Sequence, residues 1–145
     1  SMFAPALYRV PVSHGGTPQV LAFAGRAADP VAARQRNRLA YSRVGGEMHI
    51  WRSDGHTSER HPGSSTQIEY NPRFSPDGRR LAFESDRSGA EEVWVSNSDG
   101  SRATQVTNFG QHSGSPAWSP DGRWSVFDSR NVDGPWAMWV HDASG

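Results

Sequence analysis

The sequence NPRFSPDGRRLAF, residues 71–83, decides the fold that we predict for this chain. A short extended run leads into Ser75-Pro76-Asp77-Gly78, and an apolar run that starts at Leu81 follows. Proline suits the second position of a type I turn because its φ is already near the required value. Aspartate can bond to its own backbone there, and glycine tolerates the exit geometry. The stretch therefore predicts two antiparallel strands joined by a tight, structural turn.

This pattern recurs along the chain. The sequence SPAWSPDGRWSVF, residues 115–127, repeats it 44 residues later with the turn Ser119-Pro120-Asp121-Gly122. A degenerate copy at 30–41 has Ala33-Arg34-Gln35-Arg36 in place of the turn. One aromatic residue per unit recurs at intervals of 43, 43 and 45 residues: Tyr8, Trp51, Trp94 and Trp139. A period in the low forties with several short strands per unit is typical of a β-propeller blade.

We therefore predict an all-β fold, a β-propeller of four-stranded antiparallel blades, of which the chain supplies about 3.3. Within a unit the strands are named A to D, and strand A is expected to follow the proline at 30, 72 or 116. No helix is predicted. The expected organisation is a single partial propeller domain of thirteen strands over residues 1–145: strands C and D of a first blade at 1–23, whole blades at 24–65 and 66–110, and strands A to C of a last blade at 111–145.

Such a chain does not close a ring by itself, since propellers need about four to eight blades. Either it is part of a longer propeller, or copies associate. In the second case the open strand C of one copy would take strand D from its neighbour. Two copies would then form a six-bladed ring with the strand at 6–12 left over, or seven blades if that strand also finds a place. We expect a homo-oligomer, with a dimer favoured.

Composition limits the functions that are open to the chain. It has 145 residues, no cysteine and a formal net charge of zero. The length suits one domain, and the absence of cysteine excludes a disulfide, a thiolate zinc site and a thiol nucleophile. Zero net charge gives no support to a nucleic-acid partner. No apolar run reaches the length of a membrane span, and no secretory signal pattern follows the opening Ser1-Met2, which is typical of a cloning remnant.

The repeat resembles a known family. The run SPDGRRLAFESDRSG at 75–89, followed by Val93-Trp94-Val95 and Asp99-Gly100, is similar to the TolB-like, WD-like propeller repeat. The copy at 115–145 matches through Phe127 and then departs, with Asp128-Ser129-Arg130-Asn131. The resemblance implies a bacterial protein. Such propellers occur in periplasmic scaffold proteins, in sensor domains of transcription regulators and as gating domains of prolyl-oligopeptidase-type serine peptidases. It also suggests a periplasmic or extracytoplasmic location.

No catalytic, cofactor or metal signature stands out. The chain lacks Gly-x-Ser-x-Gly, Walker-type and dinucleotide-binding fingerprints, and the EF-hand spacing of acids is missing. The six histidines are dispersed, so no metal site and no cofactor are predicted. Asp77, Asp99 and Asp121 are interpreted as turn residues. The Asp86-Arg87 pair after strand B is expected to form an ion pair that fixes its loop.

Loop length points to a binding face. The distance from the strand B aromatic to the strand C aromatic varies, at 10, 11 and 12 residues, while the A-to-B distance is constant. Variable loops on a constant scaffold are where binding surfaces tend to lie, and B–C and D–A loops share one face of a propeller. Glu91 belongs to one of these loops. The predicted ligand or partner face is Arg43, Glu47, Tyr70, Arg87, His112, Asn131, Asp133 and Trp136.

The sequence thus predicts a non-enzymatic scaffold module whose ligand is another protein or a peptide. Three alternatives stay open. The chain could be the gating propeller of a serine peptidase, a fragment of a sugar-active propeller enzyme, or a purely architectural partial propeller.

Overall fold

The computed structural model describes residues 6–11, 16–35, 37–45, 47–130 and 134–143. Its thirteen elements are all strands, which confirms the all-β prediction and the predicted number. They are β1 (Ala6–Arg9), β2 (Gln19–Gly25), β3 (Ala27–Ala32), β4 (Leu39–Arg43), β5 (His49–Ser53), β6 (Ser58–Arg60), β7 (Glu69–Phe74), β8 (Arg80–Ser85), β9 (Glu92–Asn97), β10 (Thr104–Gln105), β11 (Ser113–Trp118), β12 (Trp124–Arg130) and β13 (Trp136–Asp142).

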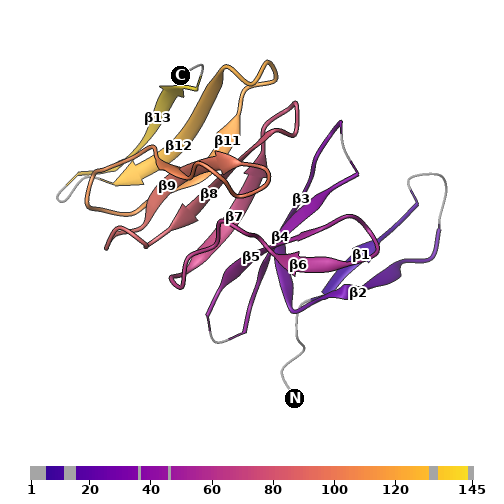
Figure 1. Ribbon diagram of the computed structural model, residues 1–145. Coiled ribbons are helices and arrows are strands. Elements are labelled where there is room, and N and C mark those ends of the chain that lie inside the picture. Colours follow the sequence, from indigo (N-terminus) through magenta and orange to yellow (C-terminus); the bar gives the residue numbers. More distant parts are fainter. Residues whose placement is uncertain (1–5, 12–15, 36, 46, 131–133, 144–145) are drawn as a thin grey trace.

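The strands form four antiparallel sheets in chain order. We call β1–β2 the N-terminal pair, β3–β6 the first blade, β7–β10 the second blade and β11–β13 the open blade. Strands of consecutive sheets are in contact, as β4 with β7 and β8 with β11. The sheets follow one another from the N-terminal pair to the open blade, which is the arrangement of successive propeller blades (Figure 1).

Strand A begins earlier than the sequence suggested. The register of each A–B pair shifts at a β-bulge that includes the proline, so the strand starts three residues before Pro30, Pro72 or Pro116. Proline has no N–H to place in a ladder, and a bulge is where a strand tolerates it. The prediction that strand A follows the proline was therefore wrong by about half a strand. The residue before each proline has a positive φ, at 49°, 53° and 51° for Asp29, Asn71 and Ser115.

The A–B turn of the second blade is held by its own side chains. Gly78 donates its N–H to the Ser75 carbonyl at 2.8 Å, and its φ of 67° suits glycine. The Asp77 carboxylate accepts from the Ser75 hydroxyl at 2.6 Å and from the Arg79 N–H at 3.0 Å. These bonds, that from Ser75 first, lower the pKa of Asp77 below its usual value. The polar groups of this turn therefore form hydrogen bonds with one another.

The core lies between sheets. One cluster packs the first blade against the second, and the other packs the N-terminal pair against the first blade. Inner faces of neighbouring sheets interdigitate in this way when sheets pack face to face. Each blade therefore depends on its neighbour to cover one face. The buried members are Ala40, Ile50, Leu81 and Phe83 in the first cluster and Ala24, Ala27 and Tyr41 in the second.

Candidate binding face and open blade

Two strands and two loops of the second and open blades bring predicted face residues together. The Tyr70 hydroxyl donates to Glu91 Oε1 at 3.0 Å, and His112 Nδ1 contacts Glu91 Oε2. The Trp136 ring stands edge-on to the His112 ring, with centroids 5.1 Å apart and planes at 84°. Tyr70 and Glu91 belong to the second blade, His112 precedes β11, and Trp136 begins β13. We call these four residues the aromatic–acid cluster, which spans the second and open blades.

The cluster combines hydrogen-bonding and aromatic groups, some of them exposed. Burial raises the pKa of Tyr70 well above its usual value, and the nearby carboxylates of Glu84 and Glu91 raise it further. The phenol is therefore a neutral hydrogen-bond donor at physiological pH. The Glu91 and His112 side chains are each 41% exposed. A partly exposed carboxylate, imidazole and indole together offer polar and aromatic contacts to a peptide.

Arg43 and Glu47 form a separate group on the first blade. The Arg43 guanidinium lies over the Trp51 ring at 4.5 Å from its centroid. Glu47 Oε2 contacts His49 Nε2 at 3.2 Å, and the other ring nitrogen of His49 contacts Arg60 at 3.0 Å. The predicted face thus divides into two groups on different blades. Asn131 and Asp133 lie outside the described residues.

Arg87 is placed in the interior and does not present its side chain on the face. Its guanidinium lies over the rings of Phe83 and Trp94 and pairs with the fully buried carboxylate of Glu69. Asp86, which the sequence suggested as its partner, instead accepts the Ile68 N–H at 2.9 Å. The ion pair that fixes this loop is therefore Glu69–Arg87. Sequence spacing gave no signal for it, because the partners are 18 residues apart, Glu69 in β7 and Arg87 after the end of β8.

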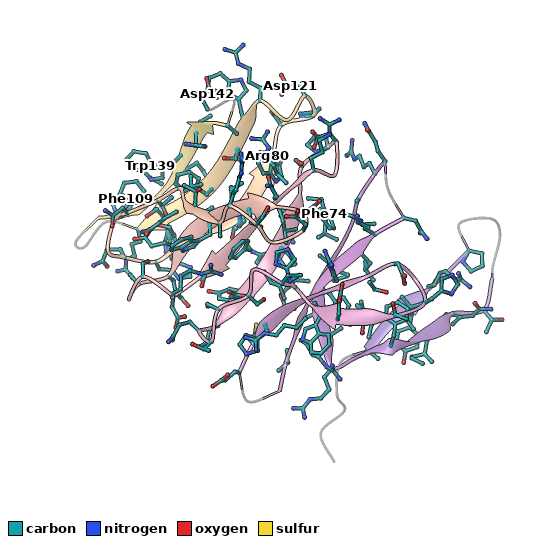
Figure 2. All side chains as sticks on the ribbon, in the orientation of Figure 1. Phe74, Arg80, Phe109, Asp121, Trp139 and Asp142 are labelled. Atoms are coloured by element: carbon teal, nitrogen blue, oxygen red, sulfur yellow. The ribbon has the colours of Figure 1, made fainter. Side chains whose placement is uncertain are left out.

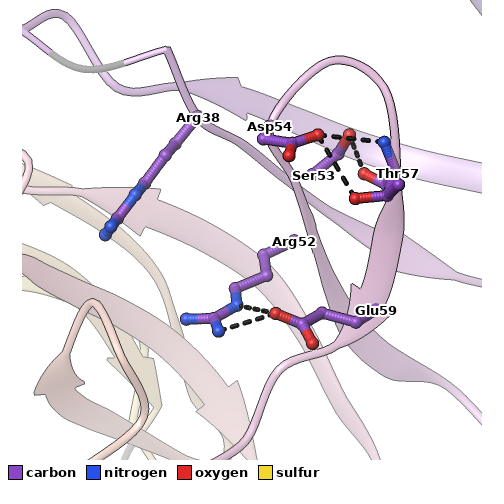
Figure 3. Close-up of a pocket in the computed structure, with 6 residues that line it drawn as sticks. All are labelled: Arg38, Arg52, Ser53, Asp54, Thr57 and Glu59. Atoms are coloured by element: carbon purple, nitrogen blue, oxygen red, sulfur yellow. Dashed lines mark hydrogen bonds and ion pairs between the residues drawn. The ribbon is translucent and has the colours of Figure 1, made fainter.

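A surface pocket of about 180 Å³ lies on the first blade at the C–D turn (Figure 3). Asp54 Oδ1 accepts the N–H of Thr57 at 2.9 Å, and Arg52 Nη2 pairs with Glu59 at 2.6 Å. Arg38 also lines the pocket and donates to Ser98 Oγ of the second blade at 3.2 Å. These polar groups bond to one another across the turn and between blades, so we assign the pocket a structural role.

No group of three or more metal-ligating side chains that could hold a metal ion is found within the part of the chain that the structure describes. In the same residues, no helix has the length and apolar character needed to cross a membrane.

The open blade has an unpaired outer edge. In the first and second blades strand C pairs with a fourth strand, β5 with β6 and β9 with β10. β13 pairs with β12 alone in the described residues, over seven positions. A seven-residue edge of this kind presents a row of free backbone groups that can pair with another strand. The edge was predicted from the sequence as a strand C without its strand D.

One face of the open blade is also uncovered. Met138 pairs with Asp128 across the open blade, as Val93 pairs with Glu84 across the second blade. Val93 is 0% exposed because β11 packs against β8 and β9, whereas Met138 is 71% exposed. Val140, two residues farther along the same face, is 65% exposed. An apolar position that is buried in the second blade is therefore exposed at the equivalent place in the open blade.

On the opposite face of β13, Trp139 contacts the segment that connects β10 to β11. The ring of Trp139 packs on that of Phe109, with centroids 5.0 Å apart (Figure 2). Trp139 nevertheless stays 37% exposed, so this face of β13 is covered only in part. Sequence reasoning included Trp136 but missed Asp128, Met138 and Val140 as candidate binding residues. Aligning them with Glu84, Val93 and Val95 of the repeat was the available signal.

The chain is similar to known proteins in sequence and in structure. The uncharacterized peptidase YuxL of Bacillus subtilis is 36% identical over 103 residues, which are 65% of this chain and 16% of that protein. The Tol-Pal system protein TolB of Pseudomonas putida is 50% identical over 46 residues, 32% of this chain and 11% of TolB. The chain therefore spans a small part of the length of these relatives.

Solved structures agree in fold. TolB from Acinetobacter baumannii superposes with a TM-score of 0.80 at 19% identity, over 96% of this chain and 35% of TolB. The propeller domain of the Trilobed protease from Pyrococcus furiosus gives a TM-score of 0.57 at 16% identity, over 80% of this chain and 38% of that domain. The TolB β-propeller domain model matches residues 28–145. With this match over most of its length, repeated four-stranded blades and the recurring Ser-Pro-Asp-Gly turn, the chain belongs to the TolB β-propeller domain family.

Proposed function

We propose that this chain is a non-enzymatic, protein- or peptide-binding scaffold module that accepts a strand at the edge of β13. The observation that carries the proposal is that edge: seven residues long, unpaired on its outer side among the described residues, and flanked by the exposed side chains of Trp136, Met138 and Val140. Strand addition gives affinity through main-chain hydrogen bonds and specificity through alternate side chains. The partner proposed for the edge is a second copy, which gives a homo-oligomer.

The second blade indicates which backbone groups are available. The Val93 N–H donates to Thr107 Oγ1 at 2.9 Å and the Val93 carbonyl accepts the Val106 N–H at 2.8 Å, both on the side of β10. Met138 occupies the position of Val93 in the open blade, so its N–H and C=O point to the open edge. By the alternation of a strand, the backbone of Val140 points the same way.

This geometry gives a specific test. Proline at position 140 removes an edge N–H without removing a bond to β12, whereas threonine keeps the N–H and the β-branched shape. Sedimentation equilibrium over a range of concentrations is expected to show association of the wild type. Association should be at least about tenfold weaker for Val140→Pro and within about threefold of wild type for Val140→Thr. A wild type that stays a 15.9 kDa monomer at every concentration contradicts the proposal.

A protein or peptide ligand is proposed for the aromatic–acid cluster as well, because it joins two blades on the face where loop lengths vary. Panning a random peptide display library on the immobilised chain tests it. Selected peptides are expected to bind the Trp136→Ala variant at least about tenfold more weakly than they bind wild type. The reason is that truncating a central aromatic residue commonly costs more than about 1 kcal/mol of binding free energy. Glu47→Gln on the separate group of the first blade is the matched control. Peptides that bind Trp136→Ala as tightly as wild type would show that the aromatic–acid cluster is not their binding site.

A second candidate is the gating propeller of a serine peptidase. It is favoured by the 36% identity with a protein described as a peptidase and by the likeness to the Trilobed protease propeller. The coding sequence of the parent gene decides between them: continuation into an α/β-hydrolase domain with a Gly-x-Ser-x-Gly elbow supports the peptidase, and a gene without one leaves the scaffold.

A further inference from the structure

The junction between consecutive blades contains the same hydrogen bond twice. Ser42 Oγ in β4 accepts the Asn71 N–H at 3.1 Å, and Glu84 Oε1 in β8 accepts the Ser115 N–H at 2.7 Å. Asn71 and Ser115 are the bulge residues before proline in strand A. A bulge leaves a backbone group outside the ladder of its own sheet. In both junctions strand B of the preceding blade supplies the acceptor for it.

Asp128 occupies the acceptor position in the open blade. It pairs with Met138 on β13 in the register in which Glu84 pairs with Val93 on β9. Its Oδ1 atom is buried and has no hydrogen-bond partner among the described residues. A buried acceptor without a donor is costly, and the earlier junctions satisfy this position with a bulge N–H. The carboxylate of Asp128 therefore lies where the strand A of a following blade would place a hydrogen-bond donor.

We propose that Asp128 accepts the backbone N–H of Asp29 from strand β3 of a second copy. The inference rests on the proposed self-association and adds to it the register and the recognised atoms. Asp29 is the bulge residue of β3, equivalent to Asn71 and Ser115. The N-terminal pair that precedes β3 consists of strands C and D, so the described chain offers β3 no strand B of a preceding blade. One copy thus holds an acceptor, and the other holds the matching donor.

The exchange requires β13 to replace β1 beside β2 of the second copy. Tyr8 and Trp139 are equivalent aromatics of strand C, so Leu7 and Met138 hold the same position in their strands. Leu7 packs on the buried cluster around Tyr41, while Met138 is 71% exposed. After the replacement, Met138 would make the contact with this cluster that Leu7 makes within one chain. It also exchanges a strand of four residues for one of seven.

Side-chain size fits this register. In the second junction Gly114 leaves room for Glu84, since a Cβ on Gly114 would lie 2.6 Å from Glu84 Oε2. The position equivalent to Gly114 in β3 is Ala28, which is larger by one methyl group. Asp128 is shorter than Glu84 by one methylene group. The shorter acid and the larger neighbour compensate, as close packing between blades requires.

The first test replaces the acceptor in the full chain. Asp128→Leu removes the carboxylate and keeps the branch at Cγ, and Asp128→Asn keeps a carbonyl oxygen as acceptor. Sedimentation equilibrium is expected to show self-association about 10- to 100-fold weaker for Asp128→Leu and within about fivefold of wild type for Asp128→Asn. Urea unfolding at a concentration where the chain is monomeric is expected to give an equal or higher midpoint for Asp128→Leu, because a buried carboxylate oxygen without a donor is gone.

A second variant tests the donor side in the opposite direction. Asp29→Asn removes a negative charge next to the incoming carboxylate and introduces the residue type found at position 71. Association is expected to strengthen about fivefold at low salt. Wild-type association that Asp128→Leu leaves unchanged, or a lower unfolding midpoint for that variant, overturns the role of Asp128 and leaves strand addition standing. A wild type that never associates overturns strand addition itself.

Discussion

Arg87, which follows β8, forms an ion pair with Glu69, the first residue of β7. The carboxylate of Glu69 is 0% exposed and the Arg87 side chain is 15% exposed. Glu69 also accepts the Ser65 N–H at 2.6 Å, and Arg87 donates to the Gly63 carbonyl at 3.3 Å. The pair therefore fastens the D–A connection of the first blade to the B–C loop of the second.

Loss of the arginine should destabilise the chain strongly. Arg87→Met leaves a buried carboxylate without its counter-ion, so we expect the free energy of unfolding to fall by about 3–5 kcal/mol. Urea unfolding measures it. The double variant Glu69→Gln/Arg87→Met is expected to recover much of the loss, because no charge then stays buried. Arg79→Met, at an exposed turn position, is the control and should stay within about 0.5 kcal/mol of wild type. Equal effects of Arg87→Met and Arg79→Met would contradict the assignment.

Acid should destabilise the chain through His61. Burial lowers the pKa of His61 from 6.5 to about 4, an effect larger than the opposing attraction of Glu69. Between these values the unfolded chain binds the proton and the folded chain does not, so stability falls as pH drops from 6.5 toward 4. The full change is of order 3 kcal/mol. Urea unfolding at several pH values checks it. A His61→Gln variant should lose this dependence, and an unchanged slope in that variant would exclude His61 as its source.

A close backbone approach makes Gly63 intolerant of a side chain. A Cβ on Gly63 would overlap the carbonyl group of Gly100 in the C–D turn of the second blade, and backbone cannot rotate away as a side chain can. Gly63→Ala is expected to lower the free energy of unfolding by about 1–3 kcal/mol, seen as a lower Tm. At Gly45 a Cβ meets nothing within 4 Å, so Gly45→Ala should be nearly neutral. Similar Tm values for the two variants would show that the Gly63 approach is not close in solution.

The A–B turn of the second blade should depend on Asp77. Asp77→Ala removes an acceptor for two hydrogen bonds, and we expect a loss of about 1 kcal/mol or more in chemical unfolding, with Asp77→Asn losing less. Because the pKa of Asp77 is lowered in the folded chain, its contribution is complete above 3.8 and is lost as pH falls further. An Asp77→Ala variant as stable as wild type at pH 7 and as sensitive below pH 3.8 would refute this role.

The repeat made most of the architecture predictable. The Ser-Pro-Asp-Gly turns, one aromatic residue per unit and a constant period identify four-stranded blades, because turn chemistry and strand alternation are local properties of a chain. The bulge at each proline was missed because a residue before proline usually avoids the conformation that Asn71 adopts. At two of the three bulges the preceding sheet supplies an acceptor for the bulge N–H, Ser42 for Asn71 and Glu84 for Ser115, and such contacts between sheets are not visible in the local sequence.

The candidate binding residues were likewise predictable from the sequence only in part. Loop position alone grouped Tyr70, His112 and Trp136. The structure joins Tyr70 to His112 through Glu91, and the His112 ring contacts that of Trp136. Loop position also placed Arg87 on the binding face, where the fold instead turns it inward to Glu69. Which charged side chain is buried depends on partners far along the chain, and spacing within one repeat does not contain that information.

The sequence by itself determined the repeat, the number of strands and the open strand C, since each follows from local turn and strand signals. Only the tertiary structure decided that Trp139 packs on Phe109 while Met138 and Val140, on the other face of β13, are 71% and 65% exposed. It also decided that Asp128 holds a buried oxygen with no donor in the described residues. The physical reason is that burial and hydrogen-bond satisfaction arise between neighbouring sheets, and the described residues place a sheet on only one side of the open blade.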